Sequence, residues 1–215
     1  MLSKNILDAK FFDRDPRVLA PDLLGKVLFR KYKGLWLKVQ IIETEAYLLE
    51  DKASHASLGY TEKRKALFMP AGTIYMYYSR GGDSLNISCR GEGNAVLIKS
   101  GVVFPMENPN SHEIEMMQTL NPINGRLRSV ERLCSGQTLL CKSLHLKVPE
   151  WDQKQFDAEQ FVICDLNNLP EKILKTQRLG IPPGRDEHLL YRYVDARFTS
   201  QATYKPLEKA GMKKS

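Results

Sequence analysis

The stretch LWLKVQIIETEAY, residues 35–47, predicts a long β-strand because apolar and polar residues alternate along it. Every second residue from position 37 would lie on one face of that strand, namely Leu37, Val39, Ile41, Glu43, Glu45 and Tyr47. This face is apolar until it reaches the two glutamates. Side chains two positions apart on a strand have Cα atoms about 6 to 7 Å apart, so Glu45 and Tyr47 can both border one cavity. From the strand alone, Glu43 and Glu45 can equally lie at a solvated sheet edge, since charged residues are mostly exposed.

The sequence on either side of this strand predicts a largely antiparallel sheet. Residues 26–33 form a hairpin with it around Gly34, and a helix opened by Asp15 and Pro16 precedes that hairpin and ends near Gly25. Further strands are expected at 73–79, 85–89, 94–104, 160–165 and 189–198, and helices at 111–120, 129–133 and 137–146. Residues 48–70 form a long irregular connection. The predicted fold class is α+β, with a curved, largely antiparallel sheet flanked by helices.

Length and composition are those of one globular domain. The chain has 215 residues, of which 42% are hydrophobic, and neither a linker nor a repeat divides it. We therefore expect a single domain over 1–215 with flexible ends at 1–8 and 206–215. The four cysteines lack the paired spacing of a zinc site and are expected to be free thiols. No apolar segment predicts a signal peptide or a membrane span, so a cytoplasmic protein is expected.

The charge of the chain favours an anionic partner. Its formal net charge is +7, and the basic run Lys63, Arg64 and Lys65 lies in the irregular connection after the long strand. Such runs often form only a solvated surface. These three side chains therefore either contact phosphate or are simply exposed to solvent.

Six segments of the sequence match the pattern of a known family. In chain order they are ETEAY at 43–47, His55, FMPAGTIYMY at 68–77, LNIS at 85–88, AVLI at 95–98 and LCSG at 133–136. Together they resemble the alkyladenine (3-methyladenine) DNA glycosylases, and the resemblance runs from about Phe11 to about Phe198. It implies a monofunctional enzyme that flips an alkylated or deaminated purine out of double-stranded DNA and hydrolyses its N-glycosidic bond. It implies no cofactor, a monomer, and, in a bacterium, association with the nucleoid.

The resemblance also implies roles for particular residues. Glu45 is the general base that activates water, and Tyr47, His55 and Tyr77 stack on the flipped base. Asn86 lies at the pocket wall, where it obstructs the amino group of guanine. Lys99 occupies the position of a family arginine that helps to hold the water; it keeps the charge but lacks the planar fork.

The sequence departs from the family pattern just after Tyr75 and Tyr77, which lie in the expected strand at 73–79. Relatives place a tyrosine there that fills the gap left by the flipped nucleotide, whereas this chain reads YSRGGDS at 78–84. Arg80 is the nearest positional match to that wedge, and Tyr78 is the aromatic candidate.

Other functions fit parts of the same pattern. An O-glycoside hydrolase would use Glu43 and Glu45 as its acid and base pair. A DNA-lesion-binding protein of the same fold without catalysis would tolerate the altered wedge and Lys99. A divalent metal held by Glu43, Glu45, Asp51 and His55 is disfavoured because no compact ligand motif is present.

Overall fold

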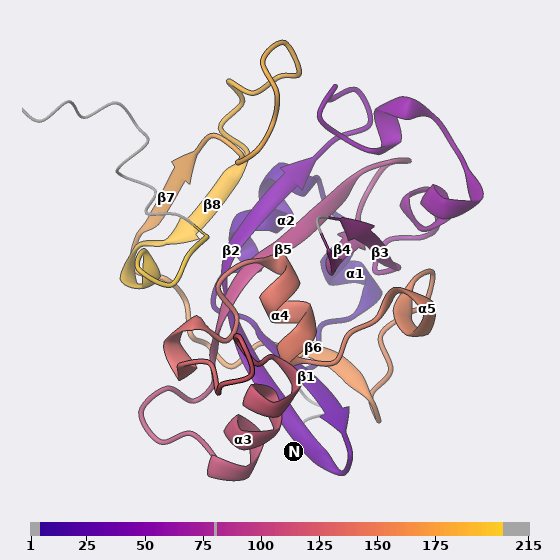
Figure 1. Ribbon diagram of the computed structural model, residues 1–215. Coiled ribbons are helices and arrows are strands. Elements are labelled where there is room, and N and C mark those ends of the chain that lie inside the picture. The colour runs from indigo at the N-terminus through magenta and orange to yellow at the C-terminus, as the bar shows by residue number, and fades with distance from the viewer. Residues whose placement is uncertain (1–4, 80, 204–215) are drawn as a thin grey trace, which may run out of the picture.

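The structure, a computed structural model, describes residues 5–79 and 81–203, and its central element is the long strand expected at 35–47 (Figure 1). Within the described residues, eight strands form one antiparallel sheet in which β2 occupies the centre. The strands are β1 (Val27–Tyr32), β2 (Leu35–Tyr47), β3 (Ile74–Ser79), β4 (Gly82–Ser88), β5 (Ala95–Val103), β6 (Phe161–Cys164), β7 (Ile173–Thr176) and β8 (Arg192–Asp195).

Strand β2 is long enough to have two successive partners on one edge. Its first half pairs with β1 through the predicted hairpin, and its second half pairs with β8 at residues 43–45. Strand β5 pairs along the opposite edge from Val39 to Tyr47, and β4 and β3 follow outward. At the hairpin Lys33 and Gly34 both have positive φ, 47° and 82°, which is the backbone of the tight turn that a two-residue hairpin favours. Glu43 and Glu45 therefore lie on a strand that is paired along both edges, and Lys99 lies on its neighbour β5.

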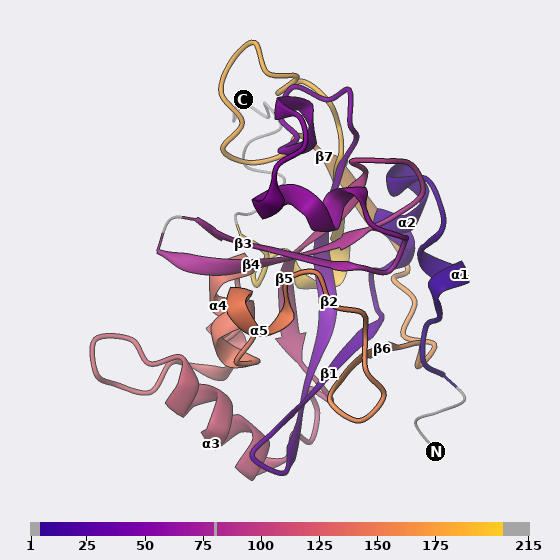
Figure 2. The same ribbon diagram turned by 90° about the vertical axis from the view of Figure 1, so that its right-hand side faces the viewer.

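Helices lie on both sides of this sheet, as the view in Figure 2 shows, with α1 and α2 on one side and α3 and α4 on the other. Helix α2 begins where predicted, because the Asp15 carboxylate accepts a hydrogen bond from Arg17 N at 2.8 Å and Pro16 occupies the first turn. The helices are α1 (Ala9–Phe12), α2 (Pro16–Asp22), α3 (Ser111–Leu120), α4 (Gln137–Ser143) and α5 (Val148–Trp151). The α+β class and the curved antiparallel sheet flanked by helices are confirmed.

Several boundaries differ from the sequence prediction. Helix α3 is capped by the Asn110 side chain rather than by Ser111, and the helix expected at 129–133 is the short 3-10 turn η4 (Val130–Arg132). Helix α4 ends at Ser143 instead of residue 146. The connection 48–70 contains two 3-10 helices, η2 (Ala56–Leu58) and η3 (Glu62–Phe68), and a third, η5 (Ala196–Phe198), follows β8. Helices α1 and α5 and strand β7 were not predicted.

The first described residues and the cysteines bear on two further expectations. Of the ends expected to be flexible, the structure describes 5–8, where Leu7 N donates a hydrogen bond to Ile163 O at 2.8 Å. All four cysteines are free, as expected, and buried. Among the described residues, no helix has both the length and the apolar character needed to cross a bilayer.

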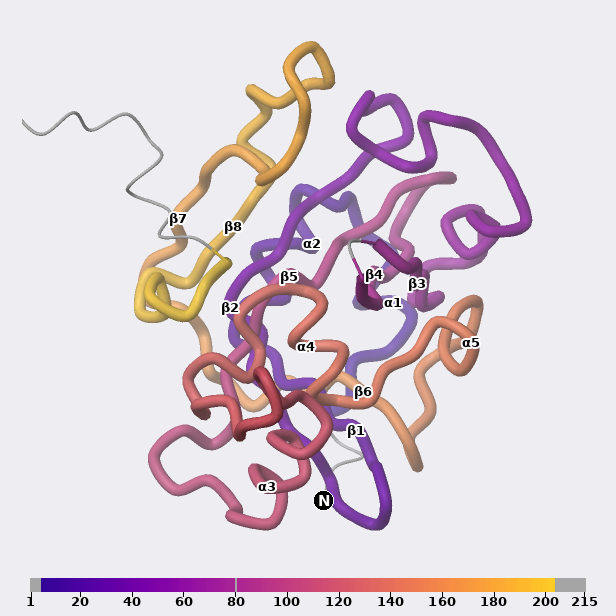
Figure 3. The backbone as a smooth tube through the Cα atoms, in the orientation of Figure 1, coloured from indigo at the N-terminus to yellow at the C-terminus, as the bar shows by residue number. Residues whose placement is uncertain are grey.

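Two loops from distant parts of the chain lie side by side at one end of the sheet (Figure 3). One follows β2 at residues 48–58, and the other joins β7 to β8 at residues 177–191. Lys52 N donates to Asp186 Oδ2 at 2.9 Å, and Arg185 Nε donates to Lys52 O at 2.8 Å. These contacts hold the loop after β2 against a loop that lies more than 130 residues later in the chain.

Candidate active site

A cavity of about 530 Å³ opens between these two loops, strands β3 to β5 and the start of α4. Its size is in the range of pockets that enclose small organic ligands. The sequence candidates Tyr47, His55, Tyr77, Asn86 and Lys99 all line it. These five residues, which are separated in the sequence, therefore meet around one space.

Glu45 lies fully buried beside the cavity and accepts hydrogen bonds from three directions. The Tyr47 hydroxyl donates to Oε2 at 2.8 Å, and Leu179 N donates to Oε1 at 3.3 Å. The Lys99 ammonium lies 3.4 Å from Oε1 and 3.5 Å from Oε2. A carboxylate oriented in this way, next to two residues that line the cavity, has the position that a general base requires.

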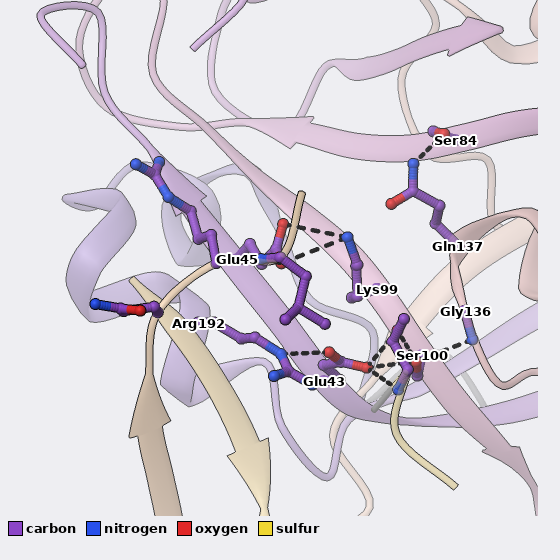
Figure 4. A network of polar contacts seen from close by, with 12 residues as sticks. Glu43, Glu45, Ser84, Lys99, Ser100, Gly136, Gln137 and Arg192 are labelled. Atoms are coloured by element: carbon purple, nitrogen blue, oxygen red, sulfur yellow. Dashed lines mark hydrogen bonds and ion pairs between the residues drawn. The ribbon is translucent and has the colours of Figure 1, made fainter. Parts of the chain in front are cut away.

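Glu43 is two residues away but has a closed environment (Figure 4). Its Oε1 accepts from Arg192 Nε at 2.6 Å, and its Oε2 accepts from Ser100 Oγ at 2.5 Å and from Thr203 N and Oγ1 at 2.8 and 2.9 Å. Neither Glu43 nor the Arg192 side chain is more than 1% exposed. Four hydrogen bonds thus engage both oxygens of Glu43, which argues against its use in the acid and base pair of an O-glycosidase.

A break in strand register explains how two consecutive residues of β5 reach these two carboxylates. The pairing runs Ile41 with Gly101, Glu43 with Ser100 and then Thr44 with Ile98, so one extra residue is accommodated on each strand in turn. Regular alternation would turn Lys99 and Ser100 to opposite faces. Instead Ser100 donates to Glu43 while Lys99 contacts Glu45.

The aromatic candidates form a connected group on one wall. Tyr75 and Tyr77 lie on the same side of β3, as the alternation predicts, with ring centroids 5.6 Å apart. The His55 ring lies 4.4 Å from that of Tyr77, and His55 Nδ1 is 2.9 Å from the Tyr75 hydroxyl. Although His55 is partly exposed, desolvation of its ring, together with the charges of Arg64 and Arg185, lowers its pKa. A neutral imidazole at pH 7 follows.

The hydroxyl groups of Tyr47 and Tyr77 are also held in their neutral form. Burial, and then the nearby Glu45 charge, raises the pKa of Tyr47 well above its ordinary value. Burial likewise raises the pKa of Tyr77, against the opposing effect of hydrogen bonds with Ser84 and Gln137. Gln137 Nε2 donates to Ser84 Oγ at 2.7 Å and lines the cavity at the start of α4.

Asn86 is held by a backbone contact and also lines the cavity. Its side chain is buried and Nδ2 donates to Tyr75 O at 3.2 Å across the β3–β4 pair, which is an ordinary backbone contact. It also lines the cavity. The amide is thus fixed by β3 and presented to whatever occupies the pocket.

The residues proposed to contact DNA differ in their exposure and in the hydrogen bonds that they already make within the protein. Lys63 and Lys65 are exposed on η3, whereas Arg64 donates to Leu58 O and Gly59 O at 3.3 and 3.0 Å and so holds the neighbouring loop. Tyr78 is 69% exposed at the end of β3. Arg80 lies outside the described residues.

Two buried arginines were missed by the sequence reasoning. Arg192 neutralises Glu43 from β8, and Arg178 pairs with Asp51 beside Tyr47, at separations of 149 and 127 residues. No local pattern marks them. In 5–79 and 81–203, no group of three or more His, Cys, Asp or Glu side chains is arranged to hold a metal ion.

Comparison with known proteins gives a consistent result. The sequence matches the family model described as methylpurine-DNA glycosylase over residues 10–198. A Pseudomonas syringae pv. syringae protein named "Putative 3-methyladenine DNA glycosylase" is 56% identical over 200 residues, which cover 93% of this chain and 90% of the relative. A Clostridium botulinum protein of the same name is 32% identical over 192 residues, covering 87% and 94%.

Proposed function

Because the chain belongs to the methylpurine-DNA glycosylase family, we propose that it is a monofunctional glycosylase that flips damaged purines out of double-stranded DNA and hydrolyses their N-glycosidic bonds. The observation that carries this proposal is the Glu45 carboxylate, fully buried and hydrogen-bonded by Tyr47 at the edge of an aromatic cavity of about 530 Å³. A flat heterocycle, a sugar and a water molecule have complementary partners there.

Extrusion of the nucleotide exposes a base that the cavity is suited to bind. Unstacking costs a few kcal/mol, and stacking on an aromatic side chain returns about 1 to 3 kcal/mol per base. Tyr47 and the pair formed by His55 and Tyr77 supply the aromatic surfaces. Alkylation leaves many purine nucleosides cationic, so the faces of these rings attract damaged bases more strongly than normal ones.

The chemical step uses Glu45 in two ways. As the bond from the sugar C1′ to the base nitrogen breaks, its electron pair leaves with the base and positive charge develops on the sugar. The Glu45 carboxylate stabilises that charge and accepts a proton from the water that attacks C1′. Lys99, about 3.5 Å from the carboxylate, orients it as a single-point cation in the place of a family arginine. The product is an abasic site.

The direct test is incubation of the protein with duplexes that contain 3-methyladenine, 7-methylguanine, hypoxanthine or ethenoadenine. Free base is measured, and the strand is then cleaved with alkali at any abasic site. Release of at least one base, with strand breaks only after alkali, is the expected result. Tight binding to an abasic-site analogue without release of any base would instead indicate a lesion-binding protein without catalysis.

Asn86→Ser is expected to relax discrimination against guanine. The shorter side chain opens space where the exocyclic amino group would lie, and steric rejection of one small group is worth about 1 to 3 kcal/mol, or roughly 5- to 150-fold. The measurement is the ratio of guanine to hypoxanthine release. Asn94→Ser is the matched control, because Asn94 Nδ2 also donates to a backbone carbonyl, that of Arg90, but Asn94 does not line the cavity. An unchanged ratio for Asn86→Ser would remove this role.

Tyr78→Ala is expected to slow excision most when the lesion is well paired. An exposed aromatic residue at the end of β3 can fill the gap left by a flipped base, and such help matters least at mismatches, where little unstacking is needed. Single-turnover rates on paired and mismatched duplexes should therefore diverge by about tenfold. Tyr60→Ala, which removes another exposed tyrosine, is the control. Equal losses on both duplexes would leave Arg80 as the wedge.

A further inference from the structure

A buried arginine lies directly behind Tyr47. The Cζ atom of Arg178 is 4.7 Å from the centroid of the Tyr47 ring and 5.4 Å from that of Tyr191. Tyr47 lines the cavity, whereas Arg178 does not, and the Arg178 side chain is fully buried. The guanidinium therefore packs on the ring from the protein interior, and leaves the cavity side of the ring for a ligand.

The orientation of this guanidinium is fixed by several acceptors. Its two terminal nitrogens both contact the Asp51 carboxylate, with Nη2 3.0 Å from Oδ1, and Nη1 also donates to Ala46 O at 3.1 Å. Asp51 is itself buried, and its Oδ1 accepts from Ala53 N at 2.9 Å. Two-point contact with a planar fork defines a plane as well as a position. A ring stacked on that plane has its tilt defined in turn.

The same ring holds the carboxylate that does the chemistry. The Tyr47 hydroxyl donates to Glu45 Oε2 at 2.8 Å, so contacts run without interruption from Asp51 through Arg178 and Tyr47 to Glu45. We propose that Arg178 is a positioning residue for base excision, which sets the ring of Tyr47 and through it the Glu45 carboxylate, and that Asp51 cancels its charge so that the ring can still bind a cationic base. This inference rests on the proposed function of the site.

The charge on Asp51 affects the choice between cationic and neutral damaged bases. A cation near an aromatic face is attracted to the ring, and a second cation on the opposite face is repelled by the first. An unpaired Arg178 would thus oppose a positively charged 7-methylguanine nucleoside more than a neutral hypoxanthine nucleoside. Paired with Asp51, it supports the ring without selecting against cationic lesions.

The positioning role is tested with Arg178→Met, and with Arg178→Met/Asp51→Asn in case the single change leaves Asp51 unpaired and prevents folding. Arg30→Met is the matched control, because Arg30 is also buried and stacks on Trp151 with its Cζ at 4.7 Å, and neither residue lines the cavity. Loss of orientation should lower single-turnover rates on both lesions by about 10- to 100-fold in the Arg178 variants that fold. Rates within about threefold of the Arg30→Met rate would overturn the proposal.

The charge-cancelling role is tested with Asp51→Asn, which retains an acceptor for Ala53 N but removes the charge. We expect the rate ratio of 7-methylguanine to hypoxanthine to fall by about fivefold, and to return in the double variant. Altered folding alone would not change this ratio, and an unchanged ratio would overturn the role of Asp51.

A protein that releases no base at all would refute the proposed function, but would still leave the positioning role testable. Ethenoadenine is fluorescent, and stacking quenches it, so its emission in bound duplex reports the ring surface of Tyr47 without any chemistry. Loss of quenching in Arg178→Met but not in Arg30→Met supports positioning, and equal quenching overturns it.

Discussion

Glu45→Gln is expected to slow base release by about 10² to 10⁴ while binding to lesion-containing DNA persists. Glutamine keeps the shape of the side chain and an oxygen that accepts from Tyr47, but it can neither take a proton from water nor oppose the charge on the sugar. The measurement is the single-turnover rate of release from a hypoxanthine duplex, together with the affinity for the same duplex.

A matched buried glutamate separates chemistry from stability. Glu113 accepts from the Lys38 ammonium at 2.9 Å and is buried on α3, away from the cavity, so Glu113→Gln also removes a buried glutamate charge beside a lysine. It should leave the rate per folded molecule unchanged. A loss of less than about tenfold in Glu45→Gln, under about 1.4 kcal/mol in activation free energy, would mean that Glu45 is not the base.

The local pattern was sufficient to predict the elements that carry the site. Alternation identified the strand with Glu45 and Tyr47, and a second alternating segment placed Tyr75 and Tyr77 on one side of β3. The turn at Gly34 and the cap at Asp15 follow from backbone preferences that act over a few residues. These features need no knowledge of distant contacts. The roles given to the individual residues came from the family resemblance, and they remain predictions.

What the sequence did not reveal depends on long-range pairing. Strand β8 lies against residues 43–45 of β2, and this contact brings Arg192 to Glu43. The loop before β8 likewise brings Arg178 to Asp51. An arginine in a basic segment has no local signal that distinguishes a buried ion pair from a solvated surface charge. The register shift that turns both Lys99 and Ser100 toward the carboxylates is also a property of two paired strands and not of either alone.

The two glutamates show how the surroundings, and not the residue type, assign a role. Both are fully buried, and each faces one cationic side chain. Glu43 has donors from Arg192, Ser100 and Thr203 at 2.5 to 2.9 Å, which leave little capacity for a water molecule. Glu45 has longer contacts with Lys99 and Leu179, at 3.3 to 3.5 Å, and these weaker contacts leave it more capacity to accept from a water molecule.

Glu43→Gln is therefore expected to destabilise the protein without removing its chemistry. The change leaves the Arg192 guanidinium buried without its carboxylate partner, and breaking a buried pair on one side costs about 3 to 5 kcal/mol in the free energy of unfolding. Urea unfolding measures that loss, and the single-turnover rate per folded molecule should stay within about threefold of the unmodified protein.

The double variant Glu43→Gln/Arg192→Met tests whether Glu43→Gln loses stability because it leaves the Arg192 charge without the Glu43 carboxylate. With both charges removed, the buried Glu43–Arg192 ion pair is replaced by two neutral side chains, so the double variant should be more stable than Glu43→Gln alone. A Glu43→Gln protein of unchanged stability that has lost more than about 100-fold in excision rate would contradict this view. It would place Glu43 in the chemistry beside Glu45 and restore the carboxylate pair suggested by their spacing of two residues.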